Sequence, residues 1–146
     1  MKITIAIPCM DMMPVPFVKS LLFMDKTDET SISLASGSLV YDSRNELLQR
    51  ALDHGVDRVL WLDSDMDVPA DALRILSQDI DVGHDVVSGL CFKRRPPFTP
   101  CVWSKCCLEE KEGKKIPAAE YVKDIPSGIF EAAAVGFGCV MMNMEA

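Results

Sequence analysis

The stretch from Val59 to Asp67 constrains the fold of this chain more than any other part of the sequence. Its first four residues, Val59–Leu62, are large and apolar, which is typical of a short strand buried on both faces of a sheet. Three carboxylates follow at alternate positions, namely Asp63, Asp65 and Asp67. Carboxylates at the carboxyl end of a buried strand lie where α/β sheets bind their ligands. Because close negative charges repel each other, this pattern favours a site for a divalent cation.

Strand and helix patterns alternate along the chain as far as Phe92, which is typical of a mostly parallel sheet with helices on both faces. The expected strands cover residues 2–9, 31–36, 58–62 and 85–92, and the expected helices cover residues 14–25, 39–54 and 69–80. Beyond the basic run Lys93–Arg95 the pattern indicates strands without helices, at residues 99–107 and 130–144, with a charged turn at 109–115. We therefore expect an α/β fold with a mixed β segment at its C-terminal end.

The composition is that of one ordinary globular domain over residues 1–146. The formal net charge of -7 argues against nucleic acid as a partner, because nucleic-acid binding requires a broad basic face. No apolar run is long enough to span a membrane, and the N-terminal run, which Pro8 interrupts, is too short for a signal peptide. An apolar strand reaches almost to Ala146, which is typical of a minimal or truncated version of a larger fold.

The six cysteines contain no C-x-x-C pair, so we do not expect a zinc framework. They are Cys9, Cys91, Cys101, Cys106, Cys107 and Cys139. Most of them lie inside apolar runs, which favours buried thiols. Because free thiols persist in a reducing compartment, we expect a cytoplasmic protein.

Three other features also contain Asp residues and offer alternative interpretations of this motif: a helix cap, a calcium-binding loop and a phosphatase active site. A helix cap accounts for one Asp after a strand better than for three at alternate positions. A calcium-binding EF-hand loop is excluded, because Val68 stands where that loop needs Gly and Arg74 stands where it needs Glu. A haloacid-dehalogenase-type phosphatase would use Asp63 as its nucleophile. Its motif usually has Thr or Val in place of Asp67 and lies on the first strand, whereas two expected strands precede the motif here.

Five segments of the sequence follow one another in a characteristic order. They are the opening strand that ends at Pro8, the helix entry Ser43-Arg44-Asn45, the block Leu60–Met66, the strand Val86–Gly89 and the late Val135–Gly138. In this order and spacing they resemble the GT-A glycosyltransferase family, particularly the family 2-like proteins of bacteria and phages. The resemblance extends from Ile3 to about Met142. It implies a GT-A-like fold, with residues 1–95 as the nucleotide-sugar-binding half and residues 96–146 as a partial acceptor-side segment.

The resemblance also implies how a donor is bound. Asp65 would ligate Mn²⁺ or Mg²⁺ that bridges the two phosphates of a nucleotide-diphosphate sugar, and Asp63 would contact the ribose or complete the metal shell. Ser64 lies between them in the Asp-x-Asp motif. Arg44 would contact the diphosphate or the base, although a solvated helix Arg accounts for it equally well. Pro8 would line the base pocket through its backbone.

The function implied by this resemblance is transfer of a sugar from the donor to an acceptor that the sequence does not identify. An inverting enzyme of this kind needs a carboxylate base for the acceptor hydroxyl. Glu131 and Glu145 lie near the glycine-containing strand, but neither fits a motif, so the catalytic base is unassigned. Two alternatives stay open: a nucleotide-binding or interaction module that does not complete the transfer, and a phosphatase with Asp63 as its nucleophile.

Overall fold

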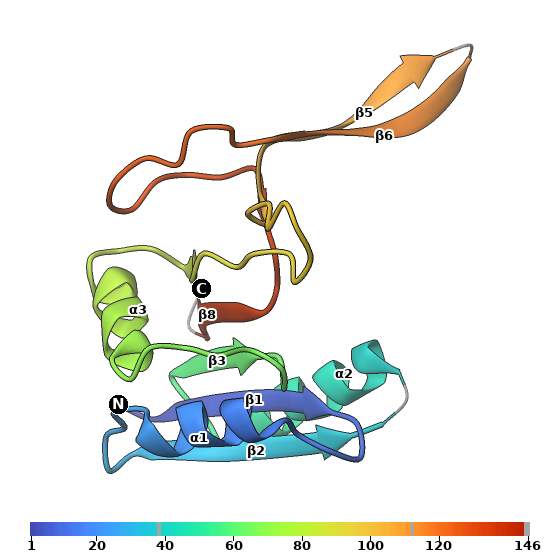
Figure 1. The fold of residues 1–146 in the computed structure, drawn as a ribbon. Coiled ribbons are helices and arrows are strands. Elements are labelled where there is room, and N and C mark those ends of the chain that lie inside the picture. The colour runs from blue at the N-terminus through green and yellow to red at the C-terminus, as the bar shows by residue number, and fades with distance from the viewer. Residues whose placement is uncertain (38, 112, 145–146) are drawn as a thin grey trace. The chain divides into compact units, whose positions relative to one another are not determined.

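The computed structural model describes residues 1–37, 39–111 and 113–144 (Figure 1). In chain order its elements are β1 (Ile3–Cys9), α1 (Val15–Phe23), β2 (Thr30–Ser36), α2 (Val40–Asp53), β3 (Arg58–Leu62), α3 (Ala72–Asp81), β4 (Val86–Ser88), β5 (Val102–Lys111), β6 (Lys114–Tyr121), β7 (Ala134–Val135) and β8 (Cys139–Asn143). Within the described ranges, none of the helices has the length and apolar character that crossing a membrane requires.

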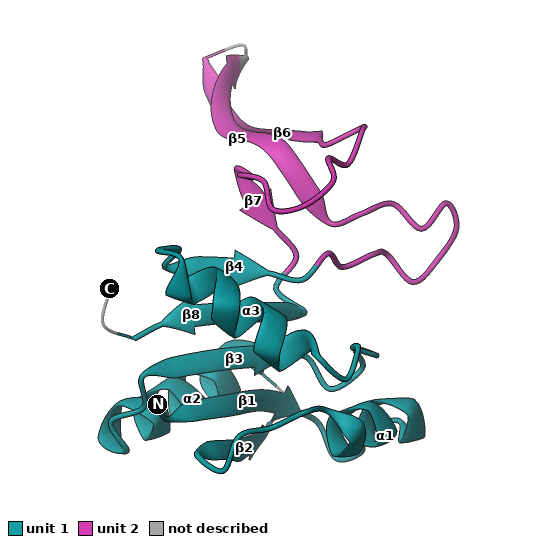
Figure 2. Cartoon of the chain, turned by 90° about the vertical axis from the view of Figure 1, so that its left-hand side faces the viewer, with its two compact units in different colours: residues 1–89, 137–146 teal, residues 90–136 magenta. Residues whose placement is uncertain are grey.

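The chain forms two compact units (Figure 2). Unit 1 consists of Met1–Gly89 together with Phe137–Ala146, and unit 2 consists of Leu90–Gly136. The resemblance implied two functional halves of one domain that meet after residue 95, and the boundaries of the compact units lie after Gly89 and after Gly136. The strand β8 therefore belongs to the same unit as β1 to β4.

Unit 1 contains a five-stranded mixed sheet with the strand order β2-β1-β3-β8-β4. β1 runs parallel to β2 and β3, and β8 runs antiparallel to both β3 and β4, so β8 alone of these five opposes the common direction. β3 lies at the centre, and all five of its residues are buried, as its apolar run predicts. The predicted α/β class with a mostly parallel sheet is confirmed.

Helices cover both faces of this sheet. On one face, Leu47 of α2 packs with Val59 and Trp61 of β3. On the other face, the guanidinium of Arg58 donates hydrogen bonds to the carbonyl and the hydroxyl of Ser77 on α3, at 2.9 and 2.6 Å. Successive residues of a strand point to opposite faces, so β3 contacts α2 through one set of side chains and α3 through the other.

The loop between β3 and α3 is held in place by contacts to α1 and to the residues that follow it. The Ser20 hydroxyl accepts a hydrogen bond from the Val68 amide at 3.0 Å and donates one to the Val68 carbonyl at 3.1 Å. The Asp25 amide donates to the Ala70 carbonyl at 2.8 Å. These contacts fix the chain immediately after the three carboxylates.

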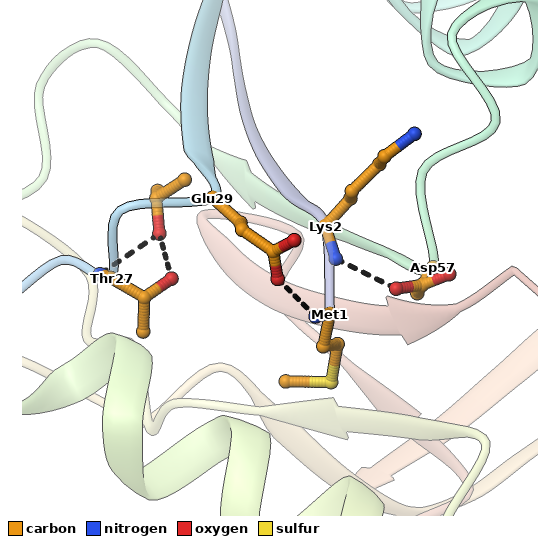
Figure 3. Close-up of polar contacts among 6 residues, drawn as sticks. Met1, Lys2, Thr27, Glu29 and Asp57 are labelled. Atoms are coloured by element: carbon orange, nitrogen blue, oxygen red, sulfur yellow. Dashed lines mark hydrogen bonds and ion pairs between the residues drawn. The ribbon is translucent and has the colours of Figure 1, made fainter.

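At the amino-terminal edge of the sheet, local polar contacts join the starts of β1, β2 and β3 (Figure 3). The amino group of Met1 forms an ion pair with Glu29, which precedes β2. The Lys2 amide donates to the carboxylate of Asp57, which precedes β3, at 2.7 Å. Because these groups are exposed, their contribution to stability is small.

Unit 2 contains a three-stranded antiparallel sheet with the order β6-β5-β7. Lys105 of β5 contacts Glu109 at 3.1 Å and Glu120 across the hairpin at 3.7 Å, and its hydrogen bond to Glu109 raises the pKa of Lys105. The rings of Trp103 and Tyr121 lie with their centroids 5.2 Å apart. Because nearly every residue of β6 is exposed, this sheet buries little apolar surface of its own.

The single strand predicted for residues 130–144 is wrong. β7 pairs with β5 in unit 2, whereas β8 pairs with β3 and β4 in unit 1. Gly136 lies between them at a close approach, because a Cβ atom there would be 2.8 Å from the Cβ of Cys101. The strand predicted at 85–92 is shorter than expected and ends at Ser88. The charged turn predicted at 109–115 largely belongs to the paired ends of β5 and β6.

Candidate functional site

The carboxyl-terminal ends of β1 and β3 lie side by side in the five-stranded sheet of unit 1. β1 pairs with β2 as far as Cys9, but it pairs with β3 only as far as Ala6. The chain passes from β1 to β2 on one side and then returns to β3 on the other, which makes a topological switch point. Open α/β sheets bind ligands in the crevice outside the strand ends at such a point. Pro8, the predicted base-pocket residue, is buried at this end of β1.

The predicted donor-binding carboxylates follow β3 directly at this edge. The Asp63 amide donates to the Gly138 carbonyl at 3.0 Å, and the Met66 amide donates to the Asp63 carbonyl at 3.1 Å. The second bond closes a turn over Ser64 and Asp65. Asp63 and Ser64 are half-buried, whereas Asp65 is exposed. The turn thus presents the whole Asp-x-Asp motif at the switch point.

Arg44 lies against the first of these carboxylates. Its Nη2 atom is 2.8 Å from Oδ1 of Asp63, in an ion pair between two half-buried side chains. Its guanidinium carbon lies 4.5 Å from the centroid of the Phe137 ring, and the Trp61 ring centroid lies 6.0 Å from that of Phe137. Together Arg44, Asp63, Phe137 and Trp61 form what we call the Arg44 cluster.

Two buried nitrogen atoms of the Arg44 cluster have no hydrogen-bond partner among the described residues. They are Nε of Arg44 and Nε1 of Trp61. An unpaired buried donor costs on the order of 1–3 kcal/mol, so such atoms are rare in folded proteins. Both atoms are N–H donors and would suit an acceptor oxygen. The Arg44 cluster therefore contains a cation that pairs with Asp63 and, among the described residues, two unpaired N–H donors that are shielded from solvent.

A cavity of about 430 Å³ lies at the carboxyl ends of β1 and β2. It is lined by the loop after β1 and by the end of the neighbouring strand: Cys9, Met10, Asp11, Met12, Met13, Leu34 and Ser36. The sequence predicted this loop only as a connection, because a Met-rich stretch between two elements carries no chemical motif. A second cavity, of about 380 Å³, lies at the opposite edge of the sheet beside Arg58 and Asp81. The first cavity is the one on the same edge as the Asp-x-Asp turn.

The carboxylate oxygens at this edge fit a metal ion whose other coordination positions are filled by a phosphate group. Over residues 1–37, 39–111 and 113–144, no three His, Cys, Asp or Glu side chains come together to hold a metal ion. Mg²⁺ is usually held by one or two carboxylates together with substrate phosphates, and Mn²⁺ also prefers oxygen ligands. Asp63 and Asp65 fit that arrangement, and their role as metal ligands stays a prediction that requires a phosphate-bearing ligand.

The catalytic base remains unassigned among the residues that the structure describes. Glu131 is exposed and belongs to unit 2, and Glu145 lies outside the described residues.

Sequence reasoning missed Trp61 and Phe137. Both belong to apolar runs that predict strand interiors. One signal for Trp61 was present, because residues two apart on a strand share a face and Asp63 is two residues further on.

Comparisons with known proteins bear on the fold. No family model matches the sequence, and no curated protein matches it either. The structure is similar to the crystal structure of A197 from STIV, with a TM-score of 0.67 and 19% sequence identity. The match covers 99% of this chain and 66% of that one, so the chain spans just under two thirds of the length of A197. At this identity the likeness concerns the fold, and the chain is an α/β protein similar in fold to A197.

Proposed function

We propose that this protein binds a nucleotide-diphosphate sugar together with a divalent metal ion and transfers the sugar to an acceptor, as a GT-A-like glycosyltransferase. The observation that carries the proposal is the ion pair of Arg44 with Asp63 at the carboxyl edge, 2.8 Å long, beside the switch point between β1 and β3. Carboxylates for a metal and a guanidinium for phosphate are the groups that a diphosphate requires.

The position of each residue supports its proposed role. Asp63 and Asp65 would hold the metal ion, and both belong, with Ser64, to the turn that the bond from the Met66 amide to the Asp63 carbonyl closes. Arg44 donates to phosphate oxygens from near the start of α2, where the helix dipole also favours an anion. Pro8 lies at the end of β1, which adjoins the cavity of about 430 Å³ where the base and ribose would fit.

The chemistry requires that negative charge on the leaving diphosphate be stabilised. A bound Mg²⁺ or Mn²⁺ supplies part of this charge stabilisation. Arg44 supplies more of it through charge-assisted hydrogen bonds, which are about twice as strong as neutral ones. We place the activity in the cytoplasm, as the cysteine pattern predicts, because free thiols persist there.

A second candidate is a nucleotide-binding module without transfer activity. This candidate rests on the unassigned catalytic base, because neither Glu131 nor Glu145 fits a motif for that role. Donor binding without sugar transfer or donor hydrolysis would favour this second candidate. Covalent capture of a phosphoryl mimic by Asp63 would instead support the phosphatase that the sequence left open.

Calorimetric titration with UDP, GDP and their sugars, with and without Mn²⁺, tests the proposal. Wild-type protein should bind at least one of them in a metal-dependent way, and Asp65→Asn should abolish that binding because it removes a ligand charge. Asp67→Asn is the matched control, since Asp67 is also an exposed carboxylate of the same loop, and it should bind nearly as well as wild type. Unchanged affinity in Asp65→Asn would refute the ligand assignment.

A further inference from the structure

We infer that Arg44 acts as the internal counter-ion of Asp63 and releases this carboxylate to a metal ion more readily when a diphosphate group is present. Each of the two ligands, metal and nucleotide, then raises the affinity of the site for the other. This inference rests on the proposed function and adds how metal binding and nucleotide binding are coupled at that site.

The first step is competition for Asp63. Nη2 of Arg44 lies 2.8 Å from Oδ1 of Asp63, and the exposed fractions of the two side chains are 28% and 36%. Ligation of Mg²⁺ needs a carboxylate oxygen at about 2.1 Å. Two cations on one carboxylate repel each other, and partial burial weakens the screening of that repulsion by water. Asp63 is therefore a weak metal ligand as long as Arg44 holds it.

The second step is the anchoring of Arg44. Its guanidinium lies 4.5 Å from the centroid of the Phe137 ring, within the range of a cation–π interaction. Phe137 in turn contacts the ring of Trp61, which is only 4% exposed and belongs to the core. The rings of Phe137 and Trp61 keep the Arg44 guanidinium beside the Asp-x-Asp turn after its ion pair with Asp63 is broken. Arg44 thus moves locally instead of swinging into solvent.

The third step is the transfer of hydrogen bonds from Asp63 to phosphate. A guanidinium presents five N–H donors in a planar fork that matches phosphate oxygens. Within the described residues, Nε of Arg44 is buried without a hydrogen-bond partner, so it has donor capacity that Asp63 does not use. When the guanidinium shifts toward a diphosphate, its N–H donors pair with phosphate oxygens, and Asp63 is freed in the same event. By linkage, each ligand raises the affinity for the other by the same factor.

Titration of the full chain with Mn²⁺, followed by the EPR signal of the free ion, tests the inference. Without nucleotide, Arg44→Gln should bind Mn²⁺ about two- to fivefold more tightly than wild type, the factor by which a part-exposed ion pair competes. In the presence of UDP the same variant should bind the Mn²⁺–UDP pair about tenfold or more weakly, because charge-assisted hydrogen bonds to phosphate are lost. The opposite signs of the two effects distinguish this role from simple damage to the site.

Two further variants control the experiment. Arg74→Gln removes a guanidinium from an exposed position on α3, where Arg74 donates to Asp71 and to Gln78, both at 3.0 Å. It should change both affinities by less than about twofold, as surface substitutions usually do. Arg44→Lys keeps the competing charge without the planar fork, so it should bind Mn²⁺ alone as weakly as wild type and lose part of the coupling to UDP.

The outcomes separate this inference from the proposed function. If wild type binds Mn²⁺ with UDP or GDP, but Arg44→Gln binds Mn²⁺ alone no more tightly than wild type, the counter-ion role is wrong and the proposed function stands. If wild type binds neither UDP nor GDP in the presence of Mn²⁺, both are wrong. Circular dichroism of each variant establishes that a lost affinity is not lost folding.

Discussion

Ser20 connects α1 to the loop that carries the three carboxylates, although it is distant from them in sequence. Its hydroxyl makes two hydrogen bonds with the main chain of Val68, one as acceptor and one as donor. A hydroxyl can serve in both ways, which an apolar side chain of similar size cannot do. The position of the Asp-x-Asp turn therefore depends in part on a residue of α1.

Ser20→Ala should lower the free energy of unfolding by about 1–2 kcal/mol, because it leaves the part-buried amide and carbonyl of Val68 without that partner. Urea denaturation followed by circular dichroism measures the loss. Ser104→Ala is the control, since Ser104 is exposed and makes one long hydrogen bond of 3.3 Å. Equal losses in the two variants would show that Ser20 has no special anchoring role.

The ion pair of Arg44 with Asp63 could be predicted only in part. The apolar run followed by Asp placed Asp63 at a strand end, and the helix pattern placed Arg44 near the start of α2. That the two side chains meet depends on how α2 crosses β3, which is set by the packing of Leu47 against Val59 and Trp61. No pattern within either segment of the sequence specifies how α2 crosses β3. The same limit hid Phe137, which reaches the cluster from the other end of the chain.

α2 is the element that places Arg44, because its buried face fixes the helix on the sheet. Leu47 has no exposed surface and packs with Ala6, Val59 and Trp61. Leu52, on the same helix, is 54% exposed. The two leucines therefore provide a matched pair for testing the helix orientation that the proposed site requires.

Leu47→Ala should lower the free energy of unfolding by about 2–4 kcal/mol, because it removes buried methyl groups and leaves a cavity. Leu52→Ala should change it by less than about 0.5 kcal/mol, as expected for a surface position. Guanidinium denaturation of both variants measures the difference. A larger loss for Leu52→Ala would mean that α2 buries a different face from the one described.

The strands show which strand bounds a sequence pattern can predict and which it cannot. β3 was predicted with its observed bounds, because a run of large apolar residues reports burial directly. β7 and β8 were predicted as one strand, because a continuous apolar run does not show that its two ends pair with different sheets. The residues of β6 were not predicted as a strand, since it contains Pro117 and is almost entirely exposed. Its partner β5 supplies the pairing that its composition does not indicate.

At the scale of the whole molecule, unit 2 is an insertion between two neighbouring strands of unit 1. The chain leaves unit 1 after Gly89 and returns at Phe137, and the Gly89 amide donates to the Cys139 carbonyl at 2.9 Å. The two ends of the inserted segment therefore lie close together in unit 1. Closing it with a short connection costs little loop entropy.

Replacing residues 90–136 with a short Gly/Ser linker should leave unit 1 folded, because the change removes no strand of the five-stranded sheet. The shortened protein should unfold cooperatively, and hydrogen exchange should remain slowest in β1 and β3, where the residues are most buried. Circular dichroism and hydrogen-exchange mass spectrometry measure these properties. Loss of a cooperative transition would show that unit 1 depends on unit 2 for its stability.

The position of β8 also has a consequence for synthesis on the ribosome. β8 lies between β3 and β4 in the sheet, yet all of unit 2 must be translated before it emerges. During that interval β3 presents an unpaired apolar edge, which is the kind of surface that recruits other chains. A nascent chain grows by about 5–20 residues per second, so the exposure lasts for seconds. The risk of aggregation in this protein is therefore concentrated in a defined period of its translation.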